Sequence, residues 1–352
     1  MASLSRVTAI AVAAIALLTL SSVVPISHAY ADGYVPGEST VYSTYNGTTA
    51  PYPANNSSPI FPTAHGRAGD DDVLFQNLLS AEWVVFSFYQ QGVEAFTASN
   101  FTDAGYKPTT YYRITEIRDN EAGHLAIFQE SISSTSLKPG PCQYDFGFGT
   151  SAETYLATQT VIEVSSMAFL TALSLEAKLN ATKGALIAIA EVESRHLTWG
   201  LIDVWNVDPF SGPIDTVYPY VNQIFQVTNQ FIIPGSCPEA NPEYPYPTQN
   251  LPQLSNGNQV LVPGSNMTFI FANESHVPSF SSDGEYYAVF FHGLLEISVP
   301  YDVETNSSVI PDVFENKGII IAVIADEQGA PTEESVLAGP LFILLQPGGL
   351  AL

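Results

Sequence analysis

Apolar residues recur every three or four positions along four stretches of the chain, and this spacing predicts four long amphipathic helices. The first helix follows Asp70, Asp71 and Asp72, whose negative charges suit the positive end of a helix dipole. A shorter helix is expected within 217–231. We expect the four long helices at about residues 73–96, 110–133, 152–179 and 181–204. This part of the chain is therefore predicted to form a four-helix bundle.

The lengths of the connections predict how these helices are arranged. Short links between the first and second helices, and between the third and fourth, suit antiparallel neighbours. Roughly 18 residues join the second helix to the third, and at about 3.3 Å per residue they can run back along a helix of about 35 Å. Such a crossover would make the second and third helices parallel.

Beyond about residue 259 the period of apolar positions changes to two, which predicts β-strands. The apolar runs are separated by turn signals such as Ser282-Asp283-Gly284. The expected strands cover residues 267–271, 287–295, 318–325 and 341–345. We interpret this region as a small β-sandwich.

Changes in composition divide the chain into five segments. Residues before 70 are rich in Tyr, Pro, Ser, Thr and Asn, and a second Pro-rich stretch separates the helices from the strands. The predicted segments are a signal peptide (1–29), a low-complexity glycosylated arm (30–69), the helical bundle (70–237), a Pro-rich linker (238–256) and a β-rich domain (257–352).

The motif Glu-x-x-His occurs on the apolar face of both the second and the fourth expected helix. Residues three apart lie on one helical face, so each motif offers an oxygen and a nitrogen ligand to one place. A lone glutamate lies on the apolar face of each of the other two helices, at nearly the same level of the bundle. The candidate metal ligands are Glu82, Glu121, His124, Glu163, Glu193 and His196. Together they form a complete ligand set for two metal ions.

Charge balance supports a dimetal centre at this place. Burying four glutamates without cations would cost several kcal/mol per ion, whereas two divalent ions neutralise four carboxylates beside neutral imidazoles. Carboxylate and imidazole ligands without thiolate favour two iron or two manganese ions over copper(I) or structural zinc. The sequence does not distinguish iron from manganese. The alternative is a site that has lost its metals and holds protonated or solvated carboxylates.

Two neighbouring side chains have open interpretations. Arg195 can pair with a ligand carboxylate or with Glu116, Asp119 or Asp203, and an ordinary surface salt bridge is the alternative. Tyr89 lies two turns from the first ligand on the same helical face, where it is either a redox-active neighbour or plain core.

The composition is that of a globular protein, with 46% hydrophobic and 13% charged residues. The formal net charge is nevertheless −25, because 35 acidic residues face 10 basic ones. We therefore expect no nucleic-acid partner and no anionic membrane partner. The chain contains neither a phosphate-binding glycine loop nor a Gly-x-Ser-x-Gly elbow, so hydrolase and nucleotide-binding functions have no support.

The N-terminus has the features of a secretory signal. Arg6 precedes a long apolar run, and Ser27-His28-Ala29 is a small-x-small cleavage site, with cleavage after Ala31 as an alternative. A membrane anchor at this end and a lipid-anchor signal in the apolar tail are the other interpretations. We expect a secreted, extracellular protein, free or associated with a cell wall.

Eight glycosylation sequons and one cysteine pair agree with export. The chain has only Cys142 and Cys237, which we interpret as a disulfide, with two free thiols as the alternative. The sequons are at Asn46, Asn55, Asn56, Asn100, Asn180, Asn266, Asn273 and Asn306. Asn100 and Asn180 are expected between helices, where a glycan is easily accommodated.

At these ligand positions the chain resembles the secreted fungal ferritin-like family, which includes stress-response and late-sexual-development proteins. Plant desiccation-related proteins are more distantly similar. The resemblance covers about residues 70–246, and the β-rich tail is similar to that of the fungal subgroup. It implies an all-α ferritin-like four-helix bundle with a C-terminal all-β domain, and a link to stress or development rather than a defined reaction.

Two functions of different classes follow. The first is a redox enzyme, such as a ferroxidase, oxidase or catalase-like protein, whose dimetal centre acts on dioxygen, peroxide or Fe(II). The second is a non-enzymatic extracellular or cell-wall protein that protects under stress and uses the bundle as a scaffold. A carbohydrate or protein partner of the β-domain is a third possibility by analogy alone.

Overall fold

The computed structural model describes residues 58–206, 208–210, 218–257, 259, 261–315 and 318–345 of the 352-residue chain. The predicted signal peptide, most of the predicted arm and the sequons at Asn46, Asn55 and Asn56 lie outside the described residues.

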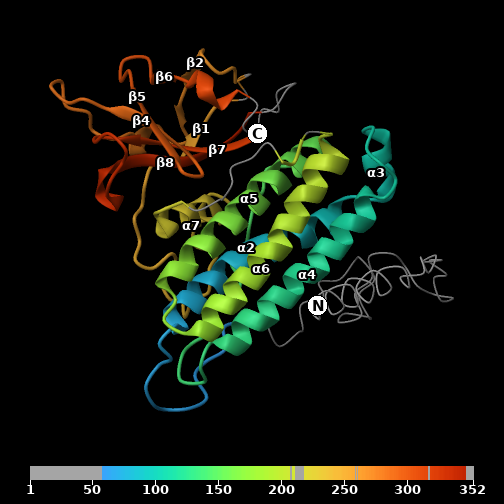
Figure 1. The fold of residues 1–352 in the computed structure, drawn as a ribbon. Helices are drawn as coiled ribbons and strands as arrows, with labels where there is room; N and C mark the ends of the chain where they lie inside the picture. The colour runs from blue at the N-terminus through green and yellow to red at the C-terminus, as the bar shows by residue number, and fades with distance from the viewer. Residues whose placement is uncertain are drawn as a thin grey trace, which may run out of the picture. The chain divides into compact units, whose positions relative to one another are not determined.

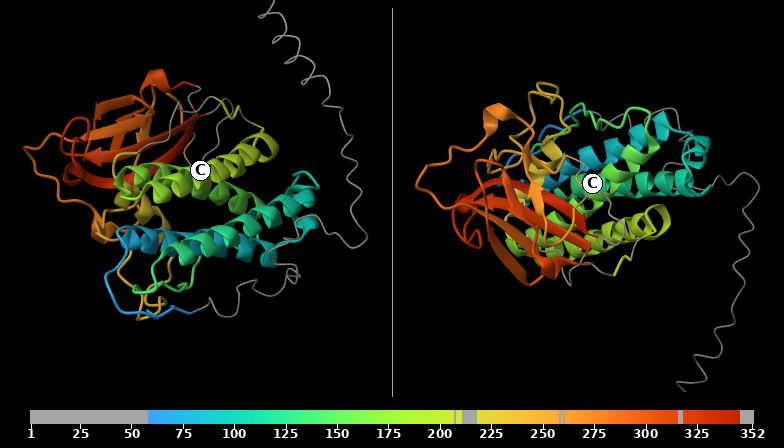
Figure 2. Two further views of the ribbon diagram at one scale, coloured as in Figure 1. Left: turned by 60° about the horizontal axis from the view of Figure 1, so that its bottom comes forward. Right: turned by 90° about the horizontal axis from the view of Figure 1, so that it is seen from above.

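Four long helices run side by side in every view (Figure 1, Figure 2). Two shorter helices, α3 (Ala98–Asp103) and α7 (Val221–Asn229), accompany them, and the π-helix η2 (Gly200–Val204) continues the last long helix. The long helices are α2 (Asp72–Ala95), α4 (Thr110–Ser131), α5 (Ala152–Glu176) and α6 (Asn180–Trp199). Each begins within one residue of the start that the apolar spacing predicted.

Hydrogen bonds at the start of α2 establish the direction of its neighbours. The carboxylate of Asp72 accepts the backbone N–H of Ser133, just past the end of α4, at 3.0 Å. The carboxylate of Asp71 accepts the N–H of Lys178 at 2.9 Å, just past the end of α5. Because α4 and α5 end at the same side of the bundle, they are parallel, and residues 132–151 form the predicted crossover.

Burial follows the apolar stripes of the helices. The core contains large side chains from all four long helices, including Trp83, Phe128, Phe169 and Leu186. Among the described residues, α5 alone is long and apolar enough to cross a membrane, and 72% of its most apolar window is buried inside the protein. Burial inside the bundle is a sufficient reason for its apolar composition.

The C-terminal region is built from antiparallel sheets (Figure 1). A four-stranded sheet has the order β5-β4-β7-β8, and two small sheets pair β1 with β3 and β2 with β6. The strands are β1 (Leu254–Ser255), β2 (Asn266–Thr268), β3 (Ile270–Phe271), β4 (Tyr287–His292), β5 (Leu295–Pro300), β6 (Ser307–Val309), β7 (Gly318–Ala325) and β8 (Val336–Leu345).

Strand β7 is buried along its whole length, which explains its unbroken apolar sequence. Ile320 and Ile324 pack into a core formed within the β-rich region, together with Met267 of β2. Ile319 and Val323, on the other face of the strand, belong to the same apolar core as the helices. A strand covered on both faces has no polar side, so it lacks the alternation of a half-exposed strand.

Two of the four expected strands are divided in the structure. The run 287–295 forms the hairpin of β4 and β5, because Gly293 adopts a left-handed conformation (φ 57°) that turns the chain. The run 267–271 is split at Phe269 into β2 and β3, which pair with different partners. The other two runs lie within β7 and β8, as predicted.

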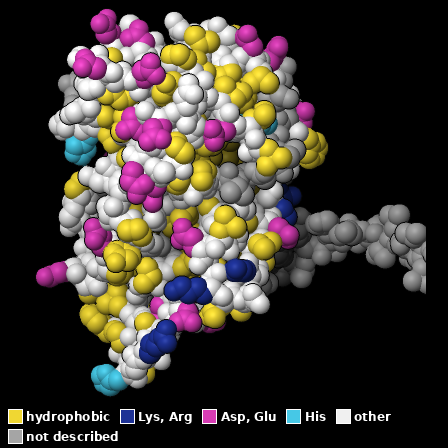
Figure 3. Space-filling view, turned by 60° about the vertical axis from the view of Figure 1, so that its left-hand side comes forward, with side chains coloured by type: hydrophobic (Ala, Val, Ile, Leu, Met, Phe, Trp, Pro, Cys, Tyr) yellow, Lys and Arg dark blue, Asp and Glu magenta, His cyan; other side chains and the backbone are white. Residues whose placement is uncertain are grey.

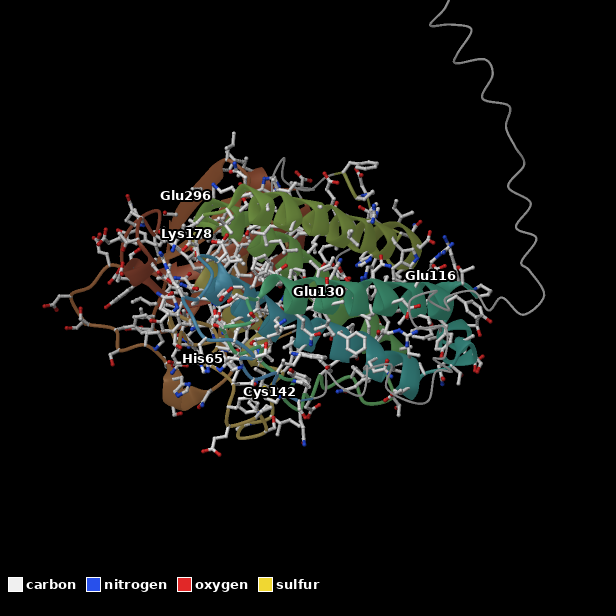
Figure 4. All side chains as sticks on the ribbon, turned by 90° about the horizontal axis from the view of Figure 1, so that it is seen from below. His65, Glu116, Glu130, Cys142, Lys178 and Glu296 are labelled. Carbon is white, nitrogen blue, oxygen red and sulfur yellow. A yellow bond between two sulfur atoms is a disulfide. The ribbon has the colours of Figure 1, made fainter. Side chains whose placement is uncertain are left out.

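A disulfide joins the crossover to the segment that follows α7. The sulfur atoms of Cys142 and Cys237 are bonded, which confirms the predicted pairing; Cys142 is labelled in Figure 4. Further along the chain, the side-chain amide of Asn77 on α2 exchanges two hydrogen bonds with the backbone of Tyr246. The Pro-rich segment predicted as a linker is therefore held against the bundle.

The positions of two sequons differ from expectation. Asn100 lies inside α3, where its side-chain oxygen accepts the backbone N–H of Thr97, and Asn180 is the first residue of α6. Both are exposed, as are Asn266 and Asn273. Asn306 is half-buried and accepts a hydrogen bond from the hydroxyl of Tyr301, so its side chain is already engaged.

Candidate metal centre

The four long helices direct four carboxylates and two imidazoles into the bundle. All six residues are at most 6% exposed, and Glu121 and Glu163 are completely buried. By contrast, Glu130, which Figure 4 labels on α4, is exposed. Glutamate is rarely buried without a partner, so burial separates these residues from the many acids of the surface (Figure 3).

One half of the centre is formed around His124. Its Nδ1 atom lies 2.8 Å from Glu121 Oε2, 3.3 Å from Glu193 Oε1 and 3.6 Å from Glu82 Oε1. These four residues offer ligand atoms that all lie within 4.8 Å of one another. The lone glutamate of α2 thus joins the motif of α4, as the sequence predicted.

The other half is formed around His196. Its Nδ1 atom lies 3.0 Å from Glu121 Oε1, 3.3 Å from Glu193 Oε2 and 3.4 Å from Glu163 Oε2. These residues form a second group whose ligand atoms lie within 4.8 Å of one another. Glu121 and Glu193 belong to both groups, and each directs one oxygen to each histidine. Two shared and two unshared carboxylates beside two histidines are compatible with metal binding in a ferritin-type bundle.

The hydrogen bonding of these groups fits metal ions. One oxygen of each glutamate and one nitrogen of His196 are buried without a hydrogen-bond partner among the described residues. The atoms concerned are Glu82 Oε1, Glu121 Oε1, Glu163 Oε2, Glu193 Oε2 and His196 Nδ1. Each of these oxygens lies 3.0–3.6 Å from a ring nitrogen of His124 or His196, so without a cation a protonated imidazole is the donor that they face. Cations bound between them would satisfy all five.

The carboxylates divide into two electrostatic classes. Burial raises the pKa of Glu163 to about 8, and burial together with the charge of Glu121 holds the pKa of Glu82 well above its usual value. Burial also acts to raise the pKa of Glu121 and Glu193, but their contacts with both histidines outweigh it and lower the pKa. Without metal, the contacts with the histidines therefore favour the charged form of the shared carboxylates, whereas burial favours the protonated form of the unshared ones.

The histidines complete this balance. Burial acts to lower the pKa of His124 and of His196, but the surrounding glutamates raise both pKa values well above the ordinary value. The fold thus favours protonated imidazoles beside charged shared carboxylates when no metal is bound. Divalent ions would take the place of protons on these groups.

Two residues outside the ligand set contact it. The hydroxyl of Tyr89 donates a hydrogen bond to Glu163, so this tyrosine is part of the site rather than plain core. The Nε2 atom of His196 lies 3.2 Å from Asn120 Oδ1, an acceptor that leaves Nδ1 facing the carboxylates. Helical spacing gave no signal for Asn120, although it directly precedes Glu121.

The suggested partners of Arg195 are engaged elsewhere. Glu116, Asp119 and Asp203 pair with Arg113, Arg118 and Lys107, respectively. Arg195 itself is exposed, so the interpretation of this residue as a partner of these three acids was wrong.

A cavity of about 520 Å³ lies away from this cluster, lined by α5, by α7 and by β1 and β8. None of the six candidate ligands lines it. The centre, whose six residues are all buried, is therefore separate from this cavity.

Comparison with known proteins agrees with this geometry. A search of curated proteins finds no match to the chain. Residues 70–201 match the family model of the ferritin-like domain, and this segment contains all six candidate ligands. The helical part of the chain is therefore a ferritin-like domain, a fold that commonly binds dimetal centres, and a C-terminal β-rich region with antiparallel sheets follows it.

Proposed function

We propose that the ferritin-like domain binds two iron or two manganese ions and carries out redox chemistry on dioxygen, peroxide or Fe(II). The observation that carries this proposal is that the four carboxylates differ in which histidines they contact. Glu121 and Glu193 each lie against both histidines, whereas Glu82 lies against His124 alone and Glu163 against His196 alone.

The roles of the residues follow from their contacts. Each ion would be held by one histidine, one unshared glutamate and one oxygen from each shared glutamate. When bound, such an ion pair supplies two redox centres and Lewis acidity for a small oxidant. Tyr89 holds the Glu163 carboxylate in place through its hydroxyl, and Asn120 orients the imidazole of His196. Neither motif contains a thiolate, which supports iron or manganese over softer metals.

We also propose that this protein acts outside the cell, in stress or development. The disulfide between Cys142 and Cys237 is typical of an oxidising compartment. Four of the predicted sequons within the described residues have exposed asparagines, which can carry glycans. Export separates the centre from cytosolic iron, so we favour redox chemistry over iron storage.

Elemental analysis tests the metal proposal directly. The protein is expressed with both iron and manganese available, purified, and measured for metal content; two ions per chain are expected. Oxygen-electrode assays with peroxide or Fe(II) then test turnover. A protein with neither bound metal nor turnover would contradict the proposal.

A double variant separates this function from a scaffold role. Glu121→Ala/Glu193→Ala removes both shared carboxylates, and the biological phenotype should be lost while the fold, measured by circular dichroism, is retained. Glu116→Ala/Glu130→Ala is the matched control, because both residues lie outside the site on α4. If the phenotype survives loss of the shared carboxylates, the bundle serves as a scaffold.

A further inference from the structure

A second polar cluster lies inside the bundle on the same face of α5 as Glu163. Gln159 is completely buried, and neither its side-chain oxygen nor its nitrogen has a hydrogen-bond partner among the described residues. The hydroxyl of Tyr155 is equally buried and equally without a partner there. Tyr155, Gln159 and Glu163 are four residues apart, so they form one column along the helix.

Two glycines make room for these groups. A Cβ atom on Gly200 would lie 2.8 Å from Gln159 Oε1, and one on Gly92 would lie 2.3 Å from the hydroxyl oxygen of Tyr155. Gly200 is also where α6 changes into the π-helix η2, a local widening that is frequent at functional sites. Gly92 of α2 and Gly200 of η2 thus each lie directly against one unpartnered polar group of α5.

This cluster borders the half of the centre that contains Glu163 and His196. The backbone N–H of Gly200 donates to the carbonyl of His196, one turn away. Tyr89, which donates to Glu163, directly follows Phe88, whose ring stacks on Tyr155 with centroids 4.4 Å apart. Burial and then the nearby carboxylate of Glu163 raise the pKa of Tyr155 well above its ordinary value.

Other buried polar groups of α5 differ in whether the fold satisfies them. Thr160, the next residue of α5, donates its hydroxyl to the carbonyl of Leu156 and accepts the indole N–H of Trp205. Among the described residues, unpartnered buried atoms of α5 occur in Tyr155, Gln159, Glu163 and Ser166. A site that leaves an amide oxygen, an amide nitrogen and a hydroxyl unsatisfied forgoes about 1–3 kcal/mol for each, unless a bound molecule supplies the bonds.

The three groups define the chemistry of their ligand. The amide nitrogen donates, the amide oxygen accepts, and the tyrosine hydroxyl does either. Dioxygen has no hydrogen to donate and is a poor acceptor, whereas hydrogen peroxide has two donors and several lone pairs. We propose that Tyr155 and Gln159 form a binding subsite for hydrogen peroxide beside the centre. This inference rests on the proposed redox function and selects peroxide among its candidate substrates.

Nuclear magnetic resonance of the full chain, labelled with nitrogen-15 at glutamine side chains, tests the subsite. Metal-free and zinc-loaded protein are titrated with hydrogen peroxide, because zinc undergoes no redox change. We expect saturable shifts of the Gln159 amide signals, which are assigned by their absence in Gln159→Leu. Tyr155→Phe keeps the ring that stacks on Phe88 and should weaken peroxide binding about tenfold, as the loss of one hydrogen bond predicts.

Ser166→Ala is the matched control. Its hydroxyl is also buried on α5 without a partner among the described residues. Ser166 follows Glu163 along α5, however, whereas Gln159 precedes it. This variant should bind peroxide as the wild type does. The proposal is overturned if peroxide shifts no Gln159 signal, if Tyr155→Phe retains full affinity, or if Ser166→Ala weakens binding equally. Metal content, measured separately, decides the proposed function, so a metal-binding protein without these shifts rejects only the subsite.

Discussion

Two regions of the bundle that contain buried carboxylates differ in how the carboxylate oxygens are satisfied. At the start of α2, Asp71 accepts the backbone N–H groups of Lys178 and Leu179, at 2.9 and 3.0 Å. In the centre, Glu82 and Glu163 each keep one oxygen without a partner among the described residues. Burial acts to raise the pKa in both places, but hydrogen bonds outweigh it and lower the pKa of Asp71, whereas the pKa of both glutamates is raised.

This difference distinguishes a structural acid from an acid prepared for a ligand. Asp71 accepts hydrogen bonds from backbone N–H groups of the fold. It therefore connects the start of α2 to the turn between α5 and α6. Glu82 and Glu163 are buried beside other carboxylates, and burial raises the pKa of both. Burial by itself does not identify a functional acid. A buried carboxylate oxygen without a hydrogen-bond partner does.

The largest effect is expected for Glu82→Gln/Glu163→Gln. Burial raises the pKa of both glutamates in the metal-free protein and favours their protonated form, so neutral amides of the same shape should change its free energy of unfolding by no more than about 1 kcal/mol. Each ion loses its unshared carboxylate, and metal content should fall from two ions per chain to none. Elemental analysis and thermal unfolding of the same samples measure both quantities.

The two measurements can contradict the interpretation separately. Retention of both ions would show that these glutamates are not ligands. A large loss of metal-free stability would show that they act as structural acids like Asp71.

The converse behaviour is expected for Asp71→Ala. The change leaves two backbone N–H groups at the end of α5 without their acceptor, so unfolding should become easier by about 2–4 kcal/mol. Metal content should remain at two ions per chain, because Asp71 belongs to neither ligand group. Denaturant unfolding of the metal-free variant, with elemental analysis of the loaded one, checks both parts. Loss of metal by a folded Asp71→Ala protein would break the distinction between the two regions.

The same two regions show what the sequence could predict. The six candidate ligands were found because a helix fixes the positions of residues three and four apart, and burial makes polar residues on an apolar face conspicuous. The three aspartates before α2 were interpreted through the helix dipole alone. The actual partners of Asp71 are more than 100 residues away, and local spacing holds no information about them.

Other features were missed for the same reason. In the sequence Gln159 resembles any other polar residue of α5. Its lack of a hydrogen-bond partner depends on its contact with Gly200, which lies in another helix. The predicted strand 287–295 ran from β4 through the turn at Gly293 to the first residue of β5, and the rest of β5 was not predicted. Contacts between elements limited the prediction, and the short elements α3, β1 and β6 were missed.

The stability of the metal-free protein is expected to depend on pH, because buried groups of the centre have raised pKa values. Glu82, Glu163, His124 and His196 all have raised pKa values in the metal-free fold. The folded state then binds more protons than the unfolded state between about pH 6.5 and pH 8, so metal-free stability should fall as pH rises. The slope is at most about 1.4 kcal/mol per pH unit for each extra proton. Metal binding displaces these protons and should strengthen over the same window.

Calorimetric unfolding at several pH values measures this effect. The difference in Tm between loaded and metal-free protein should widen from pH 6.5 to pH 8. In Glu82→Gln/Glu163→Gln, which removes two of the four groups, the metal-free slope should decrease. A difference in Tm that is constant across this range would rule out proton displacement by the metals.

The smallest effect is expected at the edge of the centre, where Asn120 orients His196. Asn120→Ala removes the acceptor 3.2 Å from Nε2, so the ring is free to turn and its Nδ1 atom is held less firmly toward the shared carboxylates. Loss of such an orienting contact typically weakens metal binding by about 10–100-fold, and we expect the lower end because Asn120 lies at the surface. Competition with a chelator measures the affinity. Asn120→Asp keeps an acceptor at this position and should restore binding, whereas a purely structural role for Asn120 would leave Asn120→Ala with unchanged affinity and a lower Tm.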